Sequence, residues 1–468
     1  MTQAPASPPN KPSTKAIRLF QLILLAAGII WAFTISGEHL DQMQVPGFLM
    51  ALAISWWLTP EIRARAMRLG LVDKPGKETG DERHHHKVAV PRLGGVAIYI
   101  SIVATVVIAM AIGGRLPKEG GLAGIAAGGT LIFVLGLMDD LESIRASHKL
   151  MVQVLAALAA YSLGVRIEHR LPLPFDIHLP FFPDVGLSGG IDLGPWAIAV
   201  TVFWLVGIAN AVNLIDGMDG LAAGVSAISA VTIWAIAMAN GATHPHPAPY
   251  PALMAAVLAG ALLGFLRWNF NPARIFLGDS GAYLTGFVLG CIAITGVMKM
   301  ATVVTVGLPL LILFFPLLDT AWAVVRRLAK RQSIFAPDAD HIHHRLLRTG
   351  MSQKKVAYVI YGISALLGLL ASCFVGQART YLNIMIGVVA MAVFFAEVLN
   401  RHRQRRGSLP PEARSVEESE VSPTDASVDV PAAPSSLDPG EQKTRSPKMG
   451  TENSMPRLPK GQSAKEKT

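Results

Sequence analysis

Long apolar runs recur along the chain, and they constrain the fold more than any other feature of the sequence. A helix needs about 20 mostly apolar residues to cross the hydrocarbon core of a bilayer. Only 16% of the residues are charged, whereas a soluble domain has about 25%. The sequence therefore predicts an all-α fold, a polytopic transmembrane bundle of about 11–12 helices. The predicted spans are residues 17–35, 46–60, 93–113, 121–138, 148–165, 196–212, 219–239, 250–268, 281–298, 301–324, 356–375 and 381–399.

The positive charges predict the orientation of this bundle. Lysines and arginines concentrate in the loops 61–92 and 325–355, and the loops 36–45 and 240–249 contain none. In membrane proteins the cytoplasmic loops carry the excess of Lys and Arg. We therefore expect a multi-pass protein of the cell's inner (plasma) membrane, with the basic loops and both termini in the cytoplasm.

The composition divides the chain into four segments. We expect a cytoplasmic N-terminal segment (1–16), an additional transmembrane helix with its loop (17–45), the main transmembrane domain (46–400) and a disordered cytoplasmic tail (401–468). The tail has no aromatic residue beyond position 406, and such a composition does not bury enough apolar surface to fold. Basic residues before the first apolar run also resemble a cleaved signal peptide, but a retained first helix fits the alternation of the later loops better.

Several classes of function are excluded by the remaining composition. The net charge is +9, but most Lys and Arg lie in loops between apolar runs, so we expect no nucleic-acid partner. The two cysteines, Cys291 and Cys373, lie within apolar runs and indicate neither a disulfide scaffold nor a thiolate metal site. No GxxxxGK[ST] phosphate loop is present, so ATP-driven transport is not indicated.

Polar side chains interrupt the apolar runs in a few loops, all on the side of the basic loops. An acidic side chain at the centre of a bilayer costs about 2.5–3.5 kcal/mol, so acids beside apolar helices require a functional reason. Residues three apart on a helix share a face. The side chains are Asp139 and Asp140 after one apolar run, Asn210, Asn213, Asp216 and Asp219 at three-residue intervals after another, and Asp279 between glycines before a third.

The chemistry of these side chains indicates a divalent cation next to a phosphate. Carboxylate and amide oxygens are hard ligands that suit Mg²⁺ or Mn²⁺. No cysteine accompanies His341, His343 and His344, so we favour phosphate or sugar recognition by these histidines and Arg345 over zinc binding. Lys87 lies close to the membrane edge, where anionic groups collect. A cation held by acids and surrounded by basic side chains is typical of phosphoryl transfer.

Six motifs, in this order, resemble those of the polyprenyl-phosphate N-acetylhexosamine-1-phosphate transferases. Together they indicate that the resemblance covers roughly residues 46–400. The stretch 333–344 resembles the branch of that family that starts lipid-linked glycan synthesis with UDP-GlcNAc. The motifs are residues 70–75, 90–95, 136–140, 210–221, 276–281 and 333–345.

The resemblance implies a Mg²⁺-dependent phosphotransferase. A polyprenyl phosphate, such as undecaprenyl phosphate, attacks the β-phosphorus of UDP-GlcNAc and displaces UMP. The implied metal ligands are Asn213 and Asp279, the implied catalytic acids are Asp139, Asp140 and Asp216, and the implied substrate-binding residues are Lys87, Asp219, His341, His343, His344 and Arg345. Within these sets, Asp139 and Asp140 deprotonate or orient the lipid phosphate, and Asp216 and Asp219 line the nucleotide pocket.

Two alternatives remain open at this point. The first is the peptidoglycan branch of the same family, which transfers phospho-N-acetylmuramoyl-pentapeptide. The second is an ion-coupled membrane transporter, whose acids would lie near the bilayer midplane in paired repeats. The expected partners are the nucleotide sugar, the polyprenyl phosphate and the lipid bilayer, and a homodimer is left open.

Overall fold

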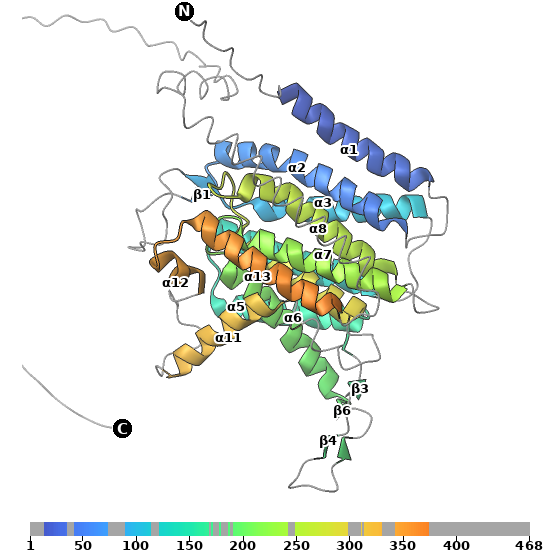
Figure 1. The fold of residues 1–468 in the computed structure, drawn as a ribbon, viewed down its shortest axis with the longest axis vertical. Helices are drawn as coiled ribbons and strands as arrows, with labels where there is room; N and C mark the ends of the chain where they lie inside the picture. Colours follow the sequence, from blue (N-terminus) through green and yellow to red (C-terminus); the bar gives the residue numbers. More distant parts are fainter. Residues whose placement is uncertain are drawn as a thin grey trace, which may run out of the picture. The chain divides into compact units, whose positions relative to one another are not determined.

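A computed structural model describes most of the predicted membrane domain. The described residues are 14–34, 42–73, 89–113, 121–167, 170–171, 177–178, 186–187, 191–241, 249–297, 310, 313–329 and 342–373. Helices make up nearly all of them (Figure 1). The helices are α1 (Thr14–Thr34), α2 (Gln44–Arg68), α3 (Gly94–Gly113), α4 (Gly121–Leu141), α5 (Ala146–Ser162), α6 (Trp196–Ile215), α7 (Leu221–Gly241), α8 (Pro249–Asn269), α9 (Gly278–Ile292), its π-helical continuation η2 (Ala293–Val297), α11 (Phe314–Ala329), α12 (Ile342–Arg348) and α13 (Gln353–Cys373).

Short antiparallel strand pairs occupy two of the loops. Strand β1 (Val72–Asp73) pairs with β2 (Val90–Pro91) between α2 and α3. Between α5 and α6, β3 (Arg170–Leu171) pairs with β6 (Ile191–Asp192), and β4 (Ile177–His178) pairs with β5 (Gly186–Leu187). Each strand has two residues, so these pairs shape loops and leave the all-α class unchanged.

Seven helices of the described part are long and apolar enough to cross a membrane, namely α2, α3, α4, α6, α7, α8 and α13. A helix that is apolar on all sides, as α3 and α4 are, is typical of a membrane span or a deep core. The predicted all-α, polytopic membrane bundle is thus confirmed. The predicted spans 17–35, 148–165 and 281–298 are also helical, as α1, α5, and α9 with η2.

Some predictions concern residues that the structure does not describe. The span 301–324 is described only at 310 and from 313 onward, and the span 381–399 and the predicted tail 401–468 lie outside the described residues. The same holds for the first 13 residues of the predicted N-terminal segment.

A row of neighbouring helices forms one side of the bundle (Figure 1). Helix α1 packs on α2, α2 on α8, α8 on α7, and α7 on α13. The predicted additional helix α1 contributes an edge contact between Phe20 and Trp56 of α2, with ring centroids 6.0 Å apart. On the other side, α4 packs on α5 and α9, and α6 packs on α9 and α11.

Helix α9 is enclosed by its neighbours α3, α4 and α6. Every residue of α9 is buried except Asp279. Glycines allow the close approach: a Cβ on Gly136 of α4 would lie 2.5 Å from the Cα of Ser280, and a Cβ on Gly286 would lie 2.7 Å from the Cα of Ala209 in α6. Small residues at helix contacts let backbones approach closely in membrane proteins. The glycines therefore fix where α9 begins relative to α4 and α6.

The loop that contains the motif 90–95 meets the loop before α9 at one end of the bundle. The backbone N–H of Phe276 donates to the carbonyl of Pro91 at 2.8 Å. In return, the N–H groups of Gly94 and Gly95 donate to the carbonyls of Phe276 and Leu277 at 3.0 and 2.9 Å. The predicted motif 90–95 therefore holds the segment that leads into α9 through backbone hydrogen bonds.

Candidate active site

Helix α9 has one residue that is not buried, Asp279, at its N-terminal end. Asp279 lies in the first turn of α9, and its side chain is 32% exposed while the rest of the helix is enclosed. A negative side chain in the first turn is favoured by the partial positive charge of the helix N-terminus. The fold therefore places one accessible carboxylate at the end of its central helix.

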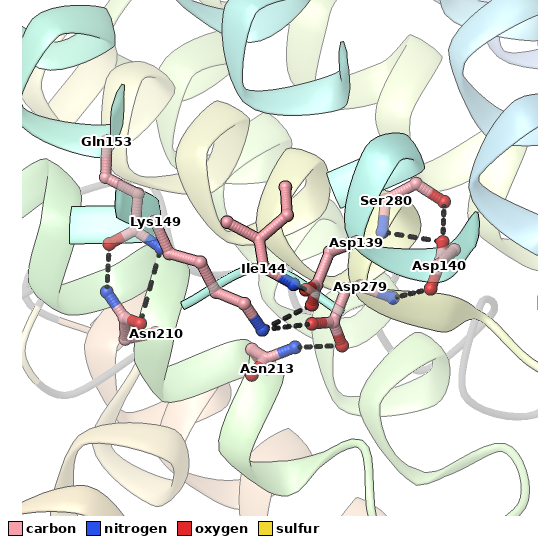
Figure 2. A network of polar contacts seen from close by, with 9 residues as sticks. All are labelled: Asp139, Asp140, Ile144, Lys149, Gln153, Asn210, Asn213, Asp279 and Ser280. Atoms are coloured by element: carbon pink, nitrogen blue, oxygen red, sulfur yellow. Dashed lines mark hydrogen bonds and ion pairs between the residues drawn. The ribbon is translucent and has the colours of Figure 1, made fainter. Parts of the chain in front are cut away.

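Three further side chains meet Asp279 there (Figure 2). The Nδ2 of Asn213, near the end of α6, donates to Asp279 Oδ1 at 3.0 Å. The Nζ of Lys149, in α5, donates to Asp279 Oδ2 at 3.3 Å and pairs with Asp139 Oδ2 at the end of α4. The other oxygen of Asp139 accepts the N–H of Ile144 at 2.8 Å. We call Asp139, Lys149, Asn213 and Asp279 the polar cluster.

Asp140 is adjacent to Asp139 but faces a different partner (Figure 2). Its Oδ1 accepts the backbone N–H of Asp279 at 2.7 Å, and its Oδ2 accepts the N–H of Ser280 at 3.0 Å and the Ser280 hydroxyl at 2.5 Å. Successive residues of a helix point about 100° apart. The two acids therefore lie at the same end of α4, one toward Lys149 and the other toward the backbone of α9.

Asp216 ends α6 and is partly exposed. Loss of hydration raises the pKa of its carboxyl well above its usual range, and the carboxylates of Asp279, Asp140 and Asp219 raise that pKa further. Carboxylates that repel one another favour a bound cation, because a cation relieves that repulsion. Asp216 lies three residues after Asn213 at the end of α6, and its predicted catalytic role stays a prediction.

Asp219 is 5% exposed and binds the loop between α8 and α9. Its Oδ2 accepts the Nδ2 of Asn271 and the backbone N–H of Ala273, both at 2.9 Å. Asn271 also donates to Gln353 Oε1 at the start of α13. Asp219 therefore connects the α6–α7 turn to this loop, and its predicted place in the nucleotide pocket stays a prediction.

The remaining predicted substrate-binding residues are only partly covered by the structure. Lys87 and His341 lie outside the described residues. His343 and His344 belong to α12, but their side chains are not among those described. Arg345 is exposed on α12, which packs against α13. Their predicted roles stay predictions.

Sequence reasoning missed two residues of the site, Lys149 and Ser280. Lys149 falls inside the predicted span 148–165, where a lone lysine at the start of an apolar run is itself a signal. Ser280 was included only as part of the motif 276–281. The first member of the amide series, Asn210, pairs instead with Gln153 of α5, its Nδ2 donating to Gln153 Oε1 at 2.8 Å (Figure 2).

The polar cluster fits a divalent cation of the magnesium type. Within the part of the chain that is described, no three His, Cys, Asp or Glu side chains form a metal cage of their own. Mg²⁺ rarely uses such a cage, because it binds through one or two carboxylates plus water and substrate phosphates. Asp139 and Asp279 both contact one cation already, the ammonium of Lys149. The two carboxylates are hard donors that converge on this ammonium, and Asn213 contacts Asp279 through its Nδ2.

A family profile and several known proteins match this chain. A family profile described as "Glycosyl transferase family 4" matches residues 122–297, which include α4, α5, α6 and α9. A Bacillus subtilis protein named "Probable undecaprenyl-phosphate N-acetylglucosaminyl 1-phosphate transferase" is 33% identical over 355 residues, which are 76% of this chain and 90% of that protein. The "Decaprenyl-phosphate N-acetylglucosaminephosphotransferase" of Mycobacterium tuberculosis is 34% identical over 381 residues, 76% of this chain and 89% of that protein.

A relative with another named substrate is also similar. The "Phospho-N-acetylmuramoyl-pentapeptide-transferase" of Desulforudis audaxviator is 30% identical over 307 residues, which are 63% of this chain and 87% of that protein. The whole polar cluster lies inside the residues that the family profile matches.

Proposed function

Given that this chain belongs to glycosyl transferase family 4 and is a phosphotransferase of the membrane, we propose that it transfers N-acetylglucosamine-1-phosphate from UDP-GlcNAc to undecaprenyl phosphate or a related polyprenyl phosphate. UMP is the second product. The observation that carries the proposal is the polar cluster, which gathers two carboxylates, an amide and an ammonium around Asp279, the one residue of α9 that is not buried.

The names of the relatives support the choice of sugar. Two relatives named for N-acetylglucosamine phosphate transfer match 76% of this chain at 33–34% identity. The relative named for the muramoyl-pentapeptide matches 63% at 30% identity. The peptidoglycan reaction is therefore the second candidate. Family membership and the position of the acids at helix ends leave the transporter alternative without support.

Asp279, Asn213 and Asp139 are the residues that would hold Mg²⁺. When bound, the ion neutralises the diphosphate of the nucleotide sugar and so favours attack by a second anion. Mn²⁺ has the same preference for oxygen ligands. The carboxylate of Asp279 is partly exposed, and the amide of Asn213 would have to turn to offer its oxygen to the ion, because its Nδ2 donates to Asp279.

The transfer forms one bond and breaks one bond. An oxygen of the lipid phosphate bonds to the β-phosphorus, and the bond from that phosphorus to the oxygen shared with the α-phosphate breaks, so that UMP leaves with the electron pair. Lys149 offsets the negative charge where the two phosphates meet, and Asp139 holds the Lys149 ammonium in place. Asp216 lies beside the nucleotide in this arrangement.

The basic end of the bundle supports a cytoplasmic active site in the inner membrane. Arg63 and Arg65 lie in the last turns of α2, and Arg63 Nε donates to the carbonyl of Arg274 at 3.0 Å, in the loop that leads to Asp279. Cytoplasmic ends of membrane helices carry the excess of basic residues. UDP-sugars are made in the cytoplasm, so the donor would reach the site from that side.

The test is a transfer assay with purified protein. The protein is incubated with Mg²⁺, undecaprenyl phosphate and UDP-GlcNAc that carries a radiolabel in the sugar. We expect a lipid-soluble labelled product and an equal amount of UMP, and no product after EDTA treatment. A parallel assay uses UDP-MurNAc-pentapeptide. Turnover of that donor alone would transfer the assignment to the peptidoglycan reaction, and turnover of neither donor would refute the proposal.

A further inference from the structure

The two adjacent acids at the end of α4 make different kinds of contact. Asp139 contacts the ammonium of a lysine side chain and one loop N–H. Asp140 is bound by three donors at the start of α9, two backbone N–H groups and one hydroxyl. Both oxygens of Asp140 are used in these bonds. A carboxylate engaged in this way is held in one orientation, which points away from the polar cluster.

The start of α9 lacks a cap of its own. The first N–H groups of a helix have no partner within the helix, and a Ser, Thr, Asp or Asn at the N-cap position usually accepts one of them. Here the N-cap residue is Leu277, which makes no side-chain hydrogen bond. The N–H groups of Asp279 and Ser280 donate to Asp140 instead. Asp140 is therefore the N-cap of α9, supplied by another helix.

The surrounding backbone leaves little freedom for another arrangement. Gly278 has φ +74°, a conformation that favours glycine. A Cβ at Gly278 would lie 2.0 Å from the carbonyl oxygen of Arg92 and 2.6 Å from Asp140 Oδ2. Ser280 is fully buried, and a Cβ on Gly95 would lie 2.4 Å from its hydroxyl. The contact between the end of α4 and the start of α9 therefore has no space for a side chain at Gly278 or Gly95.

We propose that Asp140 and Ser280 are positioning residues that hold the start of α9 so that the Asp279 carboxylate points into the polar cluster. Asp140 acts through Asp279 and does not touch the substrate, which replaces the catalytic role that the family resemblance implies for it. The proposal rests on the function proposed above in one respect, the assignment of Asp279 as a ligand of the divalent ion.

Three variants separate this role from direct participation in the reaction. In Asp140→Asn the side-chain NH₂ must face either the Asp279 or the Ser280 N–H, so one backbone donor loses its acceptor. Ser280→Ala removes only the hydroxyl and leaves the net charge unchanged. Asp139→Asn is the matched control for the state of the α9 backbone, because it changes the neighbouring acid and leaves the cap intact.

Two measurements do not depend on turnover. Mn²⁺ binding to the purified protein in lipid nanodiscs is measured by electron paramagnetic resonance, and amide hydrogen exchange is measured for peptides that cover residues 276–284. For Asp140→Asn we expect Mn²⁺ binding weaker by about tenfold and exchange of the first α9 amides faster by at least about tenfold, the effect of losing a hydrogen bond to a charged group. For Ser280→Ala we expect Mn²⁺ binding weaker by about threefold and amide exchange faster by about threefold.

The combination of variants gives the decisive comparison. Asp140→Asn with Ser280→Ala should be little worse than Asp140→Asn alone, because the two side chains act on each other. Asp139→Asn should leave the exchange of the α9 amides at the wild-type rate. If Asp140→Asn does not accumulate, Ser280→Ala alone carries the test.

Two results would overturn the inference. One is wild-type Mn²⁺ binding and wild-type exchange in Asp140→Asn together with lost turnover, which would make Asp140 a residue that acts on the substrate. The other is wild-type behaviour of Ser280→Ala in both measurements. Failure of the transfer assay in the wild-type protein would refute the proposed function alone, since neither measurement requires either substrate.

Discussion

The carboxylates at the polar end of the bundle fall into two regions that use the same chemical group in opposite ways. Asp140 and Asp219, which we call the anchoring carboxylates, accept backbone N–H groups at the two ends of the segment 273–280. In the polar cluster, Asp279 contacts the side chains of Lys149 and Asn213, and Asp139 contacts Lys149 and one loop N–H, so that an ammonium lies between the two acids. The anchoring carboxylates stabilise the fold through bonds to backbone N–H groups. The carboxylates of the polar cluster are the ones that we assign to ligand binding.

This difference shows that position in a motif does not determine the role of an acid. Asp139 and Asp140 are neighbours in the sequence, and Asp216 and Asp219 belong to one three-residue series. In each pair one member is bound to the backbone around α9 and the other lies near Asp279. Four substitutions test this difference between the two regions.

The largest effect is expected at Asp279, the centre of the polar cluster. Asp279→Asn removes the charge that we assign to metal binding, so the rate of transfer should fall by about a thousandfold, as when a main electrostatic group is lost. The rate is measured with radiolabelled UDP-GlcNAc, and membrane insertion by the yield of folded protein. Asp192→Asn, at an exposed carboxylate of β6, is the control and should stay within about twofold. A wild-type rate in Asp279→Asn would remove the metal assignment.

The next effect is expected at Lys149, which connects the two acids of the polar cluster. Lys149→Gln should lower kcat/KM by about a hundredfold, because the phosphates then meet without the ammonium that offsets their charge. If Lys149 and Asp139 act as a pair, the double variant Lys149→Gln with Asp139→Asn should be no worse than the more damaging single variant. Additive losses in kcat/KM would show that the two side chains act separately.

A smaller effect is expected from Gly278→Ala, which strains the capped start of α9. The φ of +74° disfavours alanine, and its Cβ would collide with the carbonyl of Arg92. We expect a loss of about 1–3 kcal/mol in unfolding free energy and a lower melting temperature in a thermal-shift measurement. Gly207→Ala is the matched control, because a Cβ at Gly207 meets no atom within 4 Å. Equal melting temperatures for the two variants would contradict the tight interface at Gly278.

The smallest effect is expected from Asp219→Asn. An asparagine carbonyl in the place of Oδ2 can still accept the bonds from Asn271 and Ala273. We therefore expect these two bonds to keep the α8–α9 loop in place and the transfer rate to stay within about threefold. A strong rise in KM for UDP-GlcNAc would instead support the nucleotide-lining role that the sequence predicts for Asp219.

The sequence predicted the fold class and the gathering of polar side chains at one end of the bundle, because both depend on composition and spacing. Apolar runs of spanning length are sufficient to indicate membrane helices, and acids beside such runs are costly enough to indicate a site. For this reason the gathering of Asp139, Asn213, Asp216 and Asp279 at one end of the bundle was predictable.

The spacing of the acids did not predict which of them bind the backbone and which face the polar cluster. Whether Asp139 or Asp140 faces the centre depends on the rotation of α4, which is set by contacts such as Gly136 against Ser280. Lys149 was missed because it lies at the start of the apolar run 148–165, which was assigned as a whole to a membrane span. Its partners are 10 and 130 positions away in the chain, and only the packed bundle brings them together.

The enclosure of α9 also bears on the membrane in which the protein works. A helix in contact with lipid adjusts its tilt to the thickness of the bilayer, and its ends shift in depth as it does so. Because α9 is surrounded by protein along its length, the depth of Asp279 is fixed by neighbouring helices rather than by acyl chains. We therefore expect lipids of different chain length to change the surroundings of the outer helices while the reacting groups keep their spacing.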